Sequence, residues 1–302
     1  MTTEPITIVV PFVNELAYLR ETLASAAKLE GDGWQVIVSD NTFDPALRDQ
    51  ARAAVAELAD PRVTFRAFDT HVPICASFNR AMECADTDLV ALLHSDDRIR
   101  ANYLHVMRDL IRTYPDAAAY YCGARIIDAR GRPKFSFVDF VKHFLEPRNG
   151  GAPIVLRGET GLGSLVRGNF IMGPTVLFRR SRLGGERWSD DLHQAADLEY
   201  WARILLADGT IVGTREAVYE YRRHAAQNTA VVNKSLFRYR EEVKVYDLIA
   251  ERAQARGWTA PARVARRKLI TRLQLLYEAL GDGVRLRWRA LAAKLSFLAS
   301  MR

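Results

Sequence analysis

One stretch of the chain combines a predicted buried strand with acidic side chains at its end. Residues 88–93 read Asp-Leu-Val-Ala-Leu-Leu, and His94, Ser95, Asp96 and Asp97 follow directly. The apolar run predicts a strand buried in a parallel sheet, and ligands bind at the carboxyl ends of such strands. Carboxylates held there suit Mg²⁺ or Mn²⁺, which complete their coordination with water and substrate phosphates. The alternative is that the acidic pair caps the next helix.

The elements that must position these side chains alternate between strands and helices. In order, they are strand 6–10, helix 14–28, strand 34–39, helix 45–58, strand 62–67 and helix 74–85. This alternation predicts an α/β fold, with βαβ units in a Rossmann-like, mostly parallel sheet flanked by helices. Pro11 is expected to end the first strand. Right-handed crossovers would bring the strand ends at Pro11, Asp40 and His94 to one edge.

The second half of the chain predicts a different arrangement. A helix at 102–113 and strands at 117–122 and 174–178 are followed by a helix at 195–206 and two short strands around Gly213. Residues 142–172 contain several glycines and predict a long binding loop or lid. From about residue 234 the pattern is helical, with breaks expected near 257–261 and 281–283.

Composition narrows the class of protein. The 302 residues are 49% hydrophobic and 26% charged, as in an ordinary globular protein. The net charge of +7 is concentrated in the last third, so it argues against a nucleic-acid partner. The first residues lack the basic and apolar regions of a secretion signal, and Cys75, Cys84 and Cys122 have no metal-ligand spacing. We therefore expect a cytoplasmic protein with reduced cysteines.

The order of the polar clusters resembles the family 2 glycosyltransferases of the GT-A fold over roughly residues 5–228. His94-Ser95-Asp96 occupies the position of that family's DxD metal motif. The other matching segments are residues 8–15, 36–41, 79–85, 178–181, 188–203 and 221–224. The resemblance implies a GT-A catalytic domain over 1–232 and a C-terminal helical extension over 233–302. Within the catalytic domain, 1–100 would form the nucleotide-binding half and 101–232 the acceptor-binding half.

The resemblance also implies a reaction and a set of site residues. An inverting enzyme would move a sugar from a nucleoside-diphosphate-sugar to a hydroxyl acceptor, which could be a glycan, a lipid-linked glycan or a small-molecule glycoside. Asp197 would be the general base, and a divalent cation, Mn²⁺ or Mg²⁺, would stabilise the leaving diphosphate. The nucleotide-binding residues would be Pro11, Phe12, Glu15, Asp40, Asn79, Ser95 and Asp96. Asp96, His224 and His94 would hold the metal, and Arg222 and Arg223 the phosphates.

A carboxylate can accept a hydrogen bond from the imide N–H of a base, so Asp40 favours UDP or dTDP as the nucleotide. Two departures from the family pattern leave other functions open. His94 stands where the first Asp of the DxD motif is usual, and Ala196 stands where Glu is frequent before Asp197. A non-catalytic sugar-nucleotide or nucleic-acid binding protein would explain both. A sugar nucleotidyltransferase is the second alternative, although it would need a glycine-rich phosphate loop where this chain has residues 11–15.

The C-terminal residues predict a basic amphipathic helix. Val284, Trp288, Leu291, Leu295 and Leu298 recur at steps of four and three, beside several arginines. Such a helix can lie on an anionic membrane, which would make the protein peripheral on the inner face of that membrane. The alternative is that the stripe packs on the catalytic domain or forms a homodimer contact through 233–302.

Overall fold

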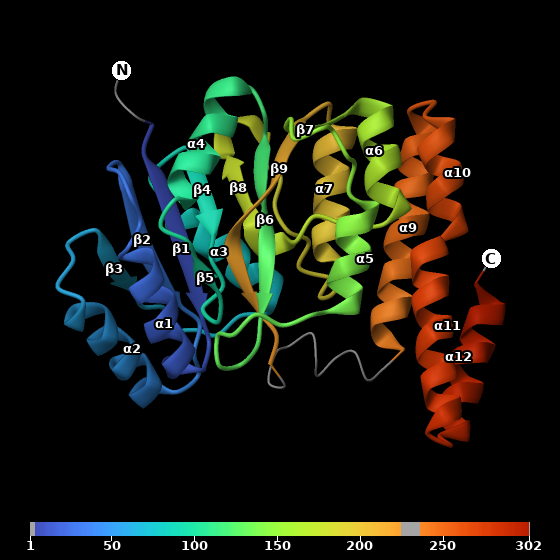
Figure 1. Cartoon of the computed structure of the whole chain (residues 1–302), viewed down its shortest axis with the longest axis horizontal. Helices are drawn as coiled ribbons and strands as arrows, with labels where there is room; N and C mark the ends of the chain where they lie inside the picture. The colour runs from blue at the N-terminus through green and yellow to red at the C-terminus, as the bar shows by residue number, and fades with distance from the viewer. Residues whose placement is uncertain (1–3, 225–235, 302) are drawn as a thin grey trace.

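A central sheet with helices on both faces organises the protein (Figure 1). The computed structural model describes residues 4–224 and 236–301, with the side chains of 138 and 143 left out. Its strand order is β3-β2-β1-β4-β8-β6-β9-β5, and β7 pairs with β9. The predicted α/β class with a helix-flanked Rossmann-like sheet is therefore confirmed.

The first half of the sheet is parallel, as the alternating pattern predicted. It contains β1 (Ile6–Phe12), β2 (Trp34–Asp40), β3 (Val63–Arg66) and β4 (Leu89–Leu92). The connecting helices are α1 (Leu16–Ala26), α2 (Pro45–Glu57) and α3 (Ile74–Glu83). The prediction that Pro11 ends β1 was wrong, because the strand continues to Phe12. The pairing between β1 and β4 stops at Val9, so Pro11 pairs only with β2. The missing N–H of Pro11 therefore removes no hydrogen bond between β1 and β4.

The second half of the sheet is mixed. β8 (Val176–Arg179) lies antiparallel between β4 and β6 (Ala119–Ile127), and β6 runs parallel to β9 (Thr210–Arg222). The short strands β5 (Arg98–Ile99) and β7 (Ile154–Arg157) both pair antiparallel with β9. Its helices are α4 (Tyr103–Thr113), α5 (Phe137–Leu145), α6 (Gly158–Arg167) and α7 (Ala196–Leu206), with short 3-10 turns η1 (Gly173–Thr175) and η2 (Arg180–Arg182).

Two predictions about this half were wrong. Residues 142–172 are not one long loop, because they contain the end of α5, β7 and α6. At least one glycine there serves close packing, since a side chain on Gly161 would overlap the backbone of Leu156. β9 is a single long strand and is not broken at Gly213. Gly213 lacks a side chain because the ring of Tyr121 fills the space that a β-carbon would occupy.

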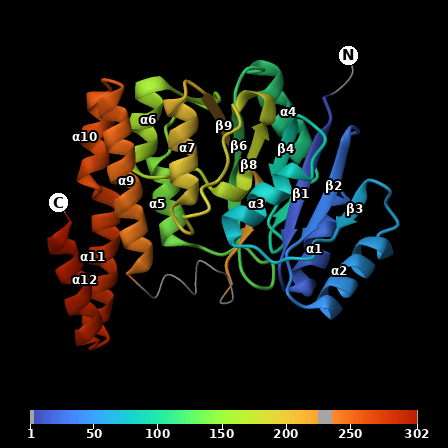
Figure 2. The same cartoon turned by 180° about the vertical axis from the view of Figure 1, so that it is seen from behind.

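The core is divided by the sheet. On one face, α1, α2 and α4 pack against the sheet, and on the other face α3, α6 and α7 do so (Figure 2). Neighbouring residues of β1 alternate between the two clusters, with Val9 in one and Val10 in the other. Both faces of the parallel strands are therefore buried, and polar side chains are left to the strand ends.

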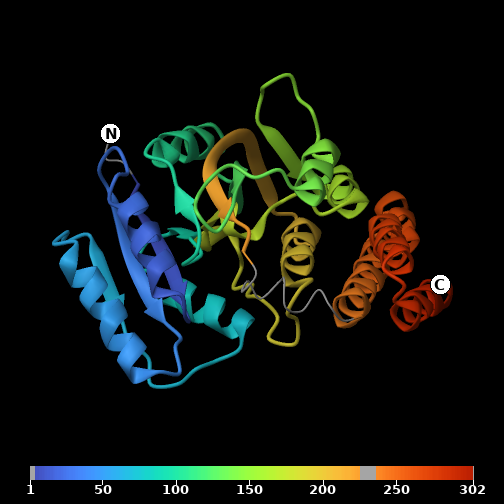
Figure 3. The ribbon, with the colours of Figure 1, turned by 60° about the horizontal axis from the view of Figure 1, so that its bottom comes forward.

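In the described part of the chain after the sheet, four helices gather at one end of the molecule (Figure 3). They are α9 (Phe237–Ala255), α10 (Thr259–Arg267), α11 (Leu269–Val284) and α12 (Trp288–Ser300). α9 and α10 share a core cluster with α6 and α7. The predicted boundary at 232/233 lies outside the described residues, and the division into domains stays a prediction. The breaks expected near 257–261 and 281–283 are present, between α9 and α10 and, at 285–287, between α11 and α12.

The break that the sequence did not predict lies at Lys268, between α10 and α11. This residue has a left-handed backbone with φ of 48°. Its ammonium is buried and pairs with Asp247 at 2.5 Å, which compensates part of the strain. The three cysteines are free and buried, as expected for reduced packed thiols. Within the described residues, no helix has the length and apolar character that crossing a membrane requires.

Candidate functional site

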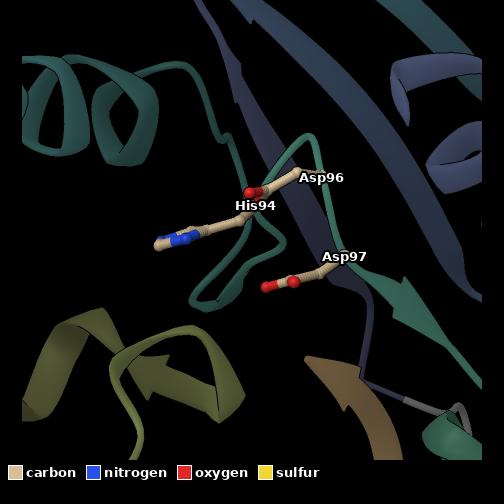
Figure 4. Close-up of side chains that lie close together, drawn as sticks. All are labelled: His94, Asp96 and Asp97. Atoms are coloured by element: carbon tan, nitrogen blue, oxygen red, sulfur yellow. The ribbon is translucent and has the colours of Figure 1, made fainter. Parts of the chain in front are cut away.

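The turn after β4 brings the residues of the DxD position together. β4 is wholly buried between β1 and β8, and the backbone N–H of Asp97 closes the turn on the carbonyl of His94 at 3.1 Å. His94, Asp96 and Asp97 each offer a ligand atom, and these atoms lie within 4.8 Å of one another. Figure 4 shows the three side chains projecting to the same side of the turn. The structure therefore brings Asp96 and His94 together, and their binding of a metal stays a prediction.

Asp97 holds the turn in place. Its carboxylate is fully buried and accepts hydrogen bonds from the hydroxyl of Tyr219 at 2.8 Å and from the backbone N–H of Arg222 at 2.7 Å. Burial, with Asp96 beside it, raises the pKa of Asp97 well above its usual range. Both of its oxygens are therefore committed to β9. The hydroxyl of Thr22 in α1 adds a hydrogen bond to the carbonyl of Asp97 at 2.7 Å.

Asp96 faces the closing end of β9. Its Oδ2 lies 2.9 Å from Nε2 of His224, and its side chain is 21% exposed against 6% for the histidine. Burial alone would raise the pKa of Asp96, but the hydrogen bond with His224 and the proximity of His94 bring that pKa below its usual value. Asp96 is therefore an ionised carboxylate at neutral pH. Asp96 and His224 therefore lie next to each other, and their binding of a metal stays a prediction.

His94 is close to both Asp96 and Asp197. Burial lowers the pKa of its imidazole, although Asp96 and Asp197 act in the opposite direction. The ring is therefore neutral at pH 7, which is the form that can coordinate a metal. It stacks on Phe78 with ring centroids 5.4 Å apart. The carboxylate of Asp96 and the imidazole of His94 belong to the cluster of possible ligand atoms, and His224 lies next to Asp96. Oxygen and nitrogen donors of this kind fit a divalent cation, with diphosphate oxygens and water to complete the shell.

Asp197 stands in the first turn of α7 and contacts the same group of rings. The indole N–H of Trp188 donates to its Oδ1 at 3.4 Å, and Trp188 packs edge-on against Phe78, the ring that stacks on His94. Burial raises the pKa of Asp197, and His94, Trp188 and the ammonium of Lys142 oppose that rise. A position at the start of a helix by itself favours the ionised form of a carboxylate. Burial has the larger effect and makes it a better base.

Gly173 in η1 makes room for Asp197, because a β-carbon at this position would overlap the carboxylate. Gly173→Ala is therefore expected to displace the carboxylate and lower transfer about tenfold or more, since small displacements of reacting groups are costly. Nucleotide affinity should stay unchanged. Gly163→Ala in α6 is the matched control, because nothing lies within 4 Å of the added methyl. Equal transfer rates in both variants would show that Asp197 does not act in the position seen here.

The predicted nucleotide-binding residues cluster where β1, β2 and β4 end. Pro11 and Phe12 are buried at the end of β1, and Phe12 pairs with Asp40 across the ladder. The buried carboxylate of Asp40 already accepts from Nε of Arg48 at 2.5 Å and from the backbone N–H of Thr42 at 3.0 Å. Glu15 is exposed just before α1, with a left-handed φ of 63°.

Ser95 is half-buried, and its carbonyl accepts from the hydroxyl of Thr22 at 3.0 Å. Asn79 lies apart from the nucleotide residues. Its Nδ2 donates to the carbonyl of Trp188 and its Oδ1 accepts from the N–H of Trp188, both at 2.9 Å. In this arrangement Asn79 positions the tryptophan that contacts Asp197, and a bond from Asn79 to the nucleotide stays a prediction.

The two arginines before His224 differ in their surroundings. Arg222 is fully buried, and its guanidinium donates to the carbonyl of Asp96 at 2.6 Å and to Glu21 at 2.6 Å. This geometry makes Arg222 a support for the turn, and its contact with phosphate stays a prediction. Arg223 pairs with Asp139 of α5 at 2.8 Å and remains 24% exposed.

Sequence reasoning did not single out Lys142 or Arg80. Lys142 of α5 lies near Asp139, Arg223 and Asp197, and burial lowers the pKa of its ammonium. It was hidden in a segment interpreted as loop. Arg80 joins the end of β2 to residues 70–72, through the carbonyl of Asp40 at 3.0 Å and the side chain of Asn41 at 2.5 Å. Arginine on a helix is common at protein surfaces, so no sequence signal distinguished it.

Comparison with known proteins finds similar sequences and similar folds. A family model described as "Glycosyl transferase family 2" matches residues 7–161, about half of the chain. An uncharacterized protein of Mycobacterium tuberculosis (strain CDC 1551 / Oshkosh) is 24% identical over 228 residues, which cover 73% of this chain and 67% of that protein.

Two solved structures share the fold. Residues 1–349 of TarS from S. aureus, in complex with UDP-GlcNAc, align with a TM-score of 0.62 and 18% identity over 82% of this chain. The chain spans 66% of that TarS structure. The mannosyltransferase PcManGT from Pyrobaculum calidifontis, in complex with GDP-Man and Mn²⁺, aligns with a TM-score of 0.62 and 15% identity, covering 99% of this chain and 86% of that one.

Proposed function

We propose, from the premise that this chain belongs to glycosyl transferase family 2, that it transfers a sugar from a nucleoside-diphosphate-sugar to a hydroxyl acceptor with inversion at the anomeric carbon. One observation carries the proposal. The neutral imidazole of His94 is close enough to interact with two different carboxylates: Asp197, whose pKa is raised by burial, and Asp96, which is ionised. One group is suited to accept a proton and the other to hold a cation, as the reaction requires.

The residues divide the work as follows. Asp197 accepts the proton of the acceptor hydroxyl while that oxygen attacks the sugar, and Trp188 and Gly173 keep its carboxylate in position. Asp96, with His224 and His94, would hold Mn²⁺ or Mg²⁺. When bound, such a cation stabilises the charge that develops on the leaving diphosphate. Asp97 and Arg222 keep the turn in the geometry that presents Asp96.

The departures from the family pattern have local explanations. Ala196 is buried in the core, whereas Asp197 next to it reaches the site, so the missing glutamate leaves the base position intact. His94 replaces a carboxylate with a neutral donor beside Asp96 and lowers the negative charge near the diphosphate. Release of sugar from a nucleotide-sugar by the purified protein, followed by assignment of the product anomer, tests the proposal. A retained configuration would contradict inversion.

The donor nucleotide is proposed to be UDP or dTDP. The carboxylate of Asp40, at the end of β2 beside Phe12, could accept a hydrogen bond from the imide N–H of uracil or thymine. A thermal-shift series with UDP, dTDP and GDP, each with and without Mn²⁺, tests this choice. The preferred nucleotide at 100 times its Kd should add about 2.7 kcal/mol of stability. The shift should depend on Mn²⁺. A larger shift with GDP would contradict the proposed base.

The acceptor class, the cytoplasmic location and the predicted contact of 233–302 with an anionic membrane or a second copy stay predictions. The stripe predicted in α12 is divided in the structure, since Trp288 and Leu295 are exposed while Leu298 packs near Tyr239 and Met301. A more continuous apolar surface lies on α11.

A further inference from the structure

α5 and α11 expose a band of large apolar side chains, here called the α5–α11 face. Its residues are Phe137, Phe140, Phe144, Leu269, Leu273, Leu276, Tyr277 and Leu280. On α11 they recur at helical spacing, and Tyr277 and Leu280 are 63% and 62% exposed. The rings of Phe137 and Tyr277 approach to 6.1 Å, which joins the two helices into one surface. An exposed apolar surface of this extent marks an interaction site.

The orientation of α11 is the reverse of that in an ordinary surface helix. A surface helix turns its apolar stripe toward the core. In α11 the buried side carries Thr271, Leu275, Ala279 and Asp282, and most of the leucines face outward. The exposed stripe is therefore not needed to hold α11 on the protein.

The charges next to this face are positive. Residues 237–302 contain fifteen Lys and Arg against six Asp and Glu. Arg285, Arg287 and Arg289 are exposed between Val284, which is 86% exposed, and Trp288. None of the three forms an ion pair with another residue that the structure describes. The nearby carboxylates of Glu278 and Asp282 are bound by Lys294, so they do not offset these arginines.

We infer that the α5–α11 face binds the surface of an anionic lipid bilayer, with the apolar side chains among the acyl chains and Arg285, Arg287 and Arg289 at the headgroups. Charge decides between this occupant and a second copy of the chain. In a two-fold dimer through this face the arginines of both copies would lie at one interface and repel each other. Anionic headgroups neutralise the same charges.

The surface also lies near the candidate site. α5 carries Phe140 outward and Asp139, which binds Arg223 next to His224, inward. Docking through α5 would therefore place the candidate site close to the lipid headgroups. The membrane contact itself does not depend on the proposed reaction and can be measured without it.

Flotation of the full chain with vesicles tests the inference. Vesicles of phosphatidylcholine with phosphatidylglycerol should carry the protein, and pure phosphatidylcholine vesicles should carry much less. Replacing Arg285, Arg287 and Arg289 together with Gln should weaken binding by about fivefold for each arginine, on the order of 100-fold in total. Raising the salt concentration should weaken the unmodified protein in the same direction.

The matched control removes three positive charges from other exposed positions, by replacing Lys28, Arg112 and Arg157 with Gln. This control should bind vesicles nearly as well as the unmodified protein.

Leu273→Gln, Leu276→Gln and Leu280→Gln, combined in one variant, should also abolish flotation while the circular-dichroism spectrum stays native. Should that variant fail to fold, the arginine variant still decides. Equal binding by the arginine variant and its control, no binding by the unmodified protein, or a lipid-independent dimer that the leucine changes dissociate would overturn the inference.

Discussion

Asp197→Asn is expected to lower sugar transfer by about 10²–10⁴-fold, the usual contribution of a general base. Asparagine keeps the shape of the side chain and can still accept from Trp188, but it has no basic oxygen. Because the proposed base acts on the acceptor, the affinity for the nucleotide should hardly change. Single-turnover transfer and nucleotide titration on the same preparation measure the two effects separately.

Two controls make this result specific. Asp191→Asn, an exposed carboxylate in the loop before α7, should leave transfer near that of the unmodified protein. Burial raises the pKa of Asp197, so the ionised carboxylate that is present at neutral pH destabilises the folded state. Asp197→Asn should therefore not lower the melting temperature at neutral pH. Near-normal transfer by Asp197→Asn would remove Asp197 from the mechanism.

The pH profile gives a further readout for the same residue. Only the ionised form of Asp197 accepts a proton, and its pKa lies above the usual value of 3.8 because the carboxylate is buried. Transfer should therefore fall as the pH is lowered through that raised pKa. The remaining activity of Asp197→Asn should lack this acidic limb. An unchanged limb in the variant would assign it to another group.

Asp96→Ala is expected to abolish the Mn²⁺-dependent part of nucleoside-diphosphate binding. Asp96 is the ionised carboxylate of the His94, Asp96 and His224 group, and Asp97 already directs both oxygens to β9. Calorimetric titration of UDP with and without Mn²⁺ measures the change. Unaltered metal dependence in the variant would show that the cation binds elsewhere.

Asp97→Ala is the informative contrast. It removes the buried acceptor for Tyr219 and Arg222, and an unsatisfied buried donor costs about 1–3 kcal/mol. This variant should therefore lower the free energy of unfolding in a urea titration, whereas Asp96→Ala should leave it nearly unchanged. These results would assign Asp96 to binding of the cation and Asp97 to stabilising the turn.

The sequence by itself determined the parallel half of the sheet and the polar side chains that lie where its strands end. Buried strands such as Val36–Val38 and Leu89–Leu92 form near-continuous apolar runs, because both of their faces lie against helices. The polar side chains that interrupt those runs, among them Asp40 and Asp96, had to lie at the strand ends. The family resemblance and the position of Asp96 at a strand end could therefore be predicted from the sequence alone.

Tertiary structure decided what each polar group does. Asp96 and Asp97 are adjacent in sequence, yet Asp97 became a support because Tyr219 and Arg222, more than 120 residues away, use both of its oxygens. The pKa of Asp197 followed from burial among distant residues and not from its place at the start of α7. The outward turn of the leucines of α11 could not be predicted either. A helical stripe is the same in sequence whether it faces a core or a solvent, and only the packing of Leu275 and Ala279 on the neighbouring helices determines which side is covered.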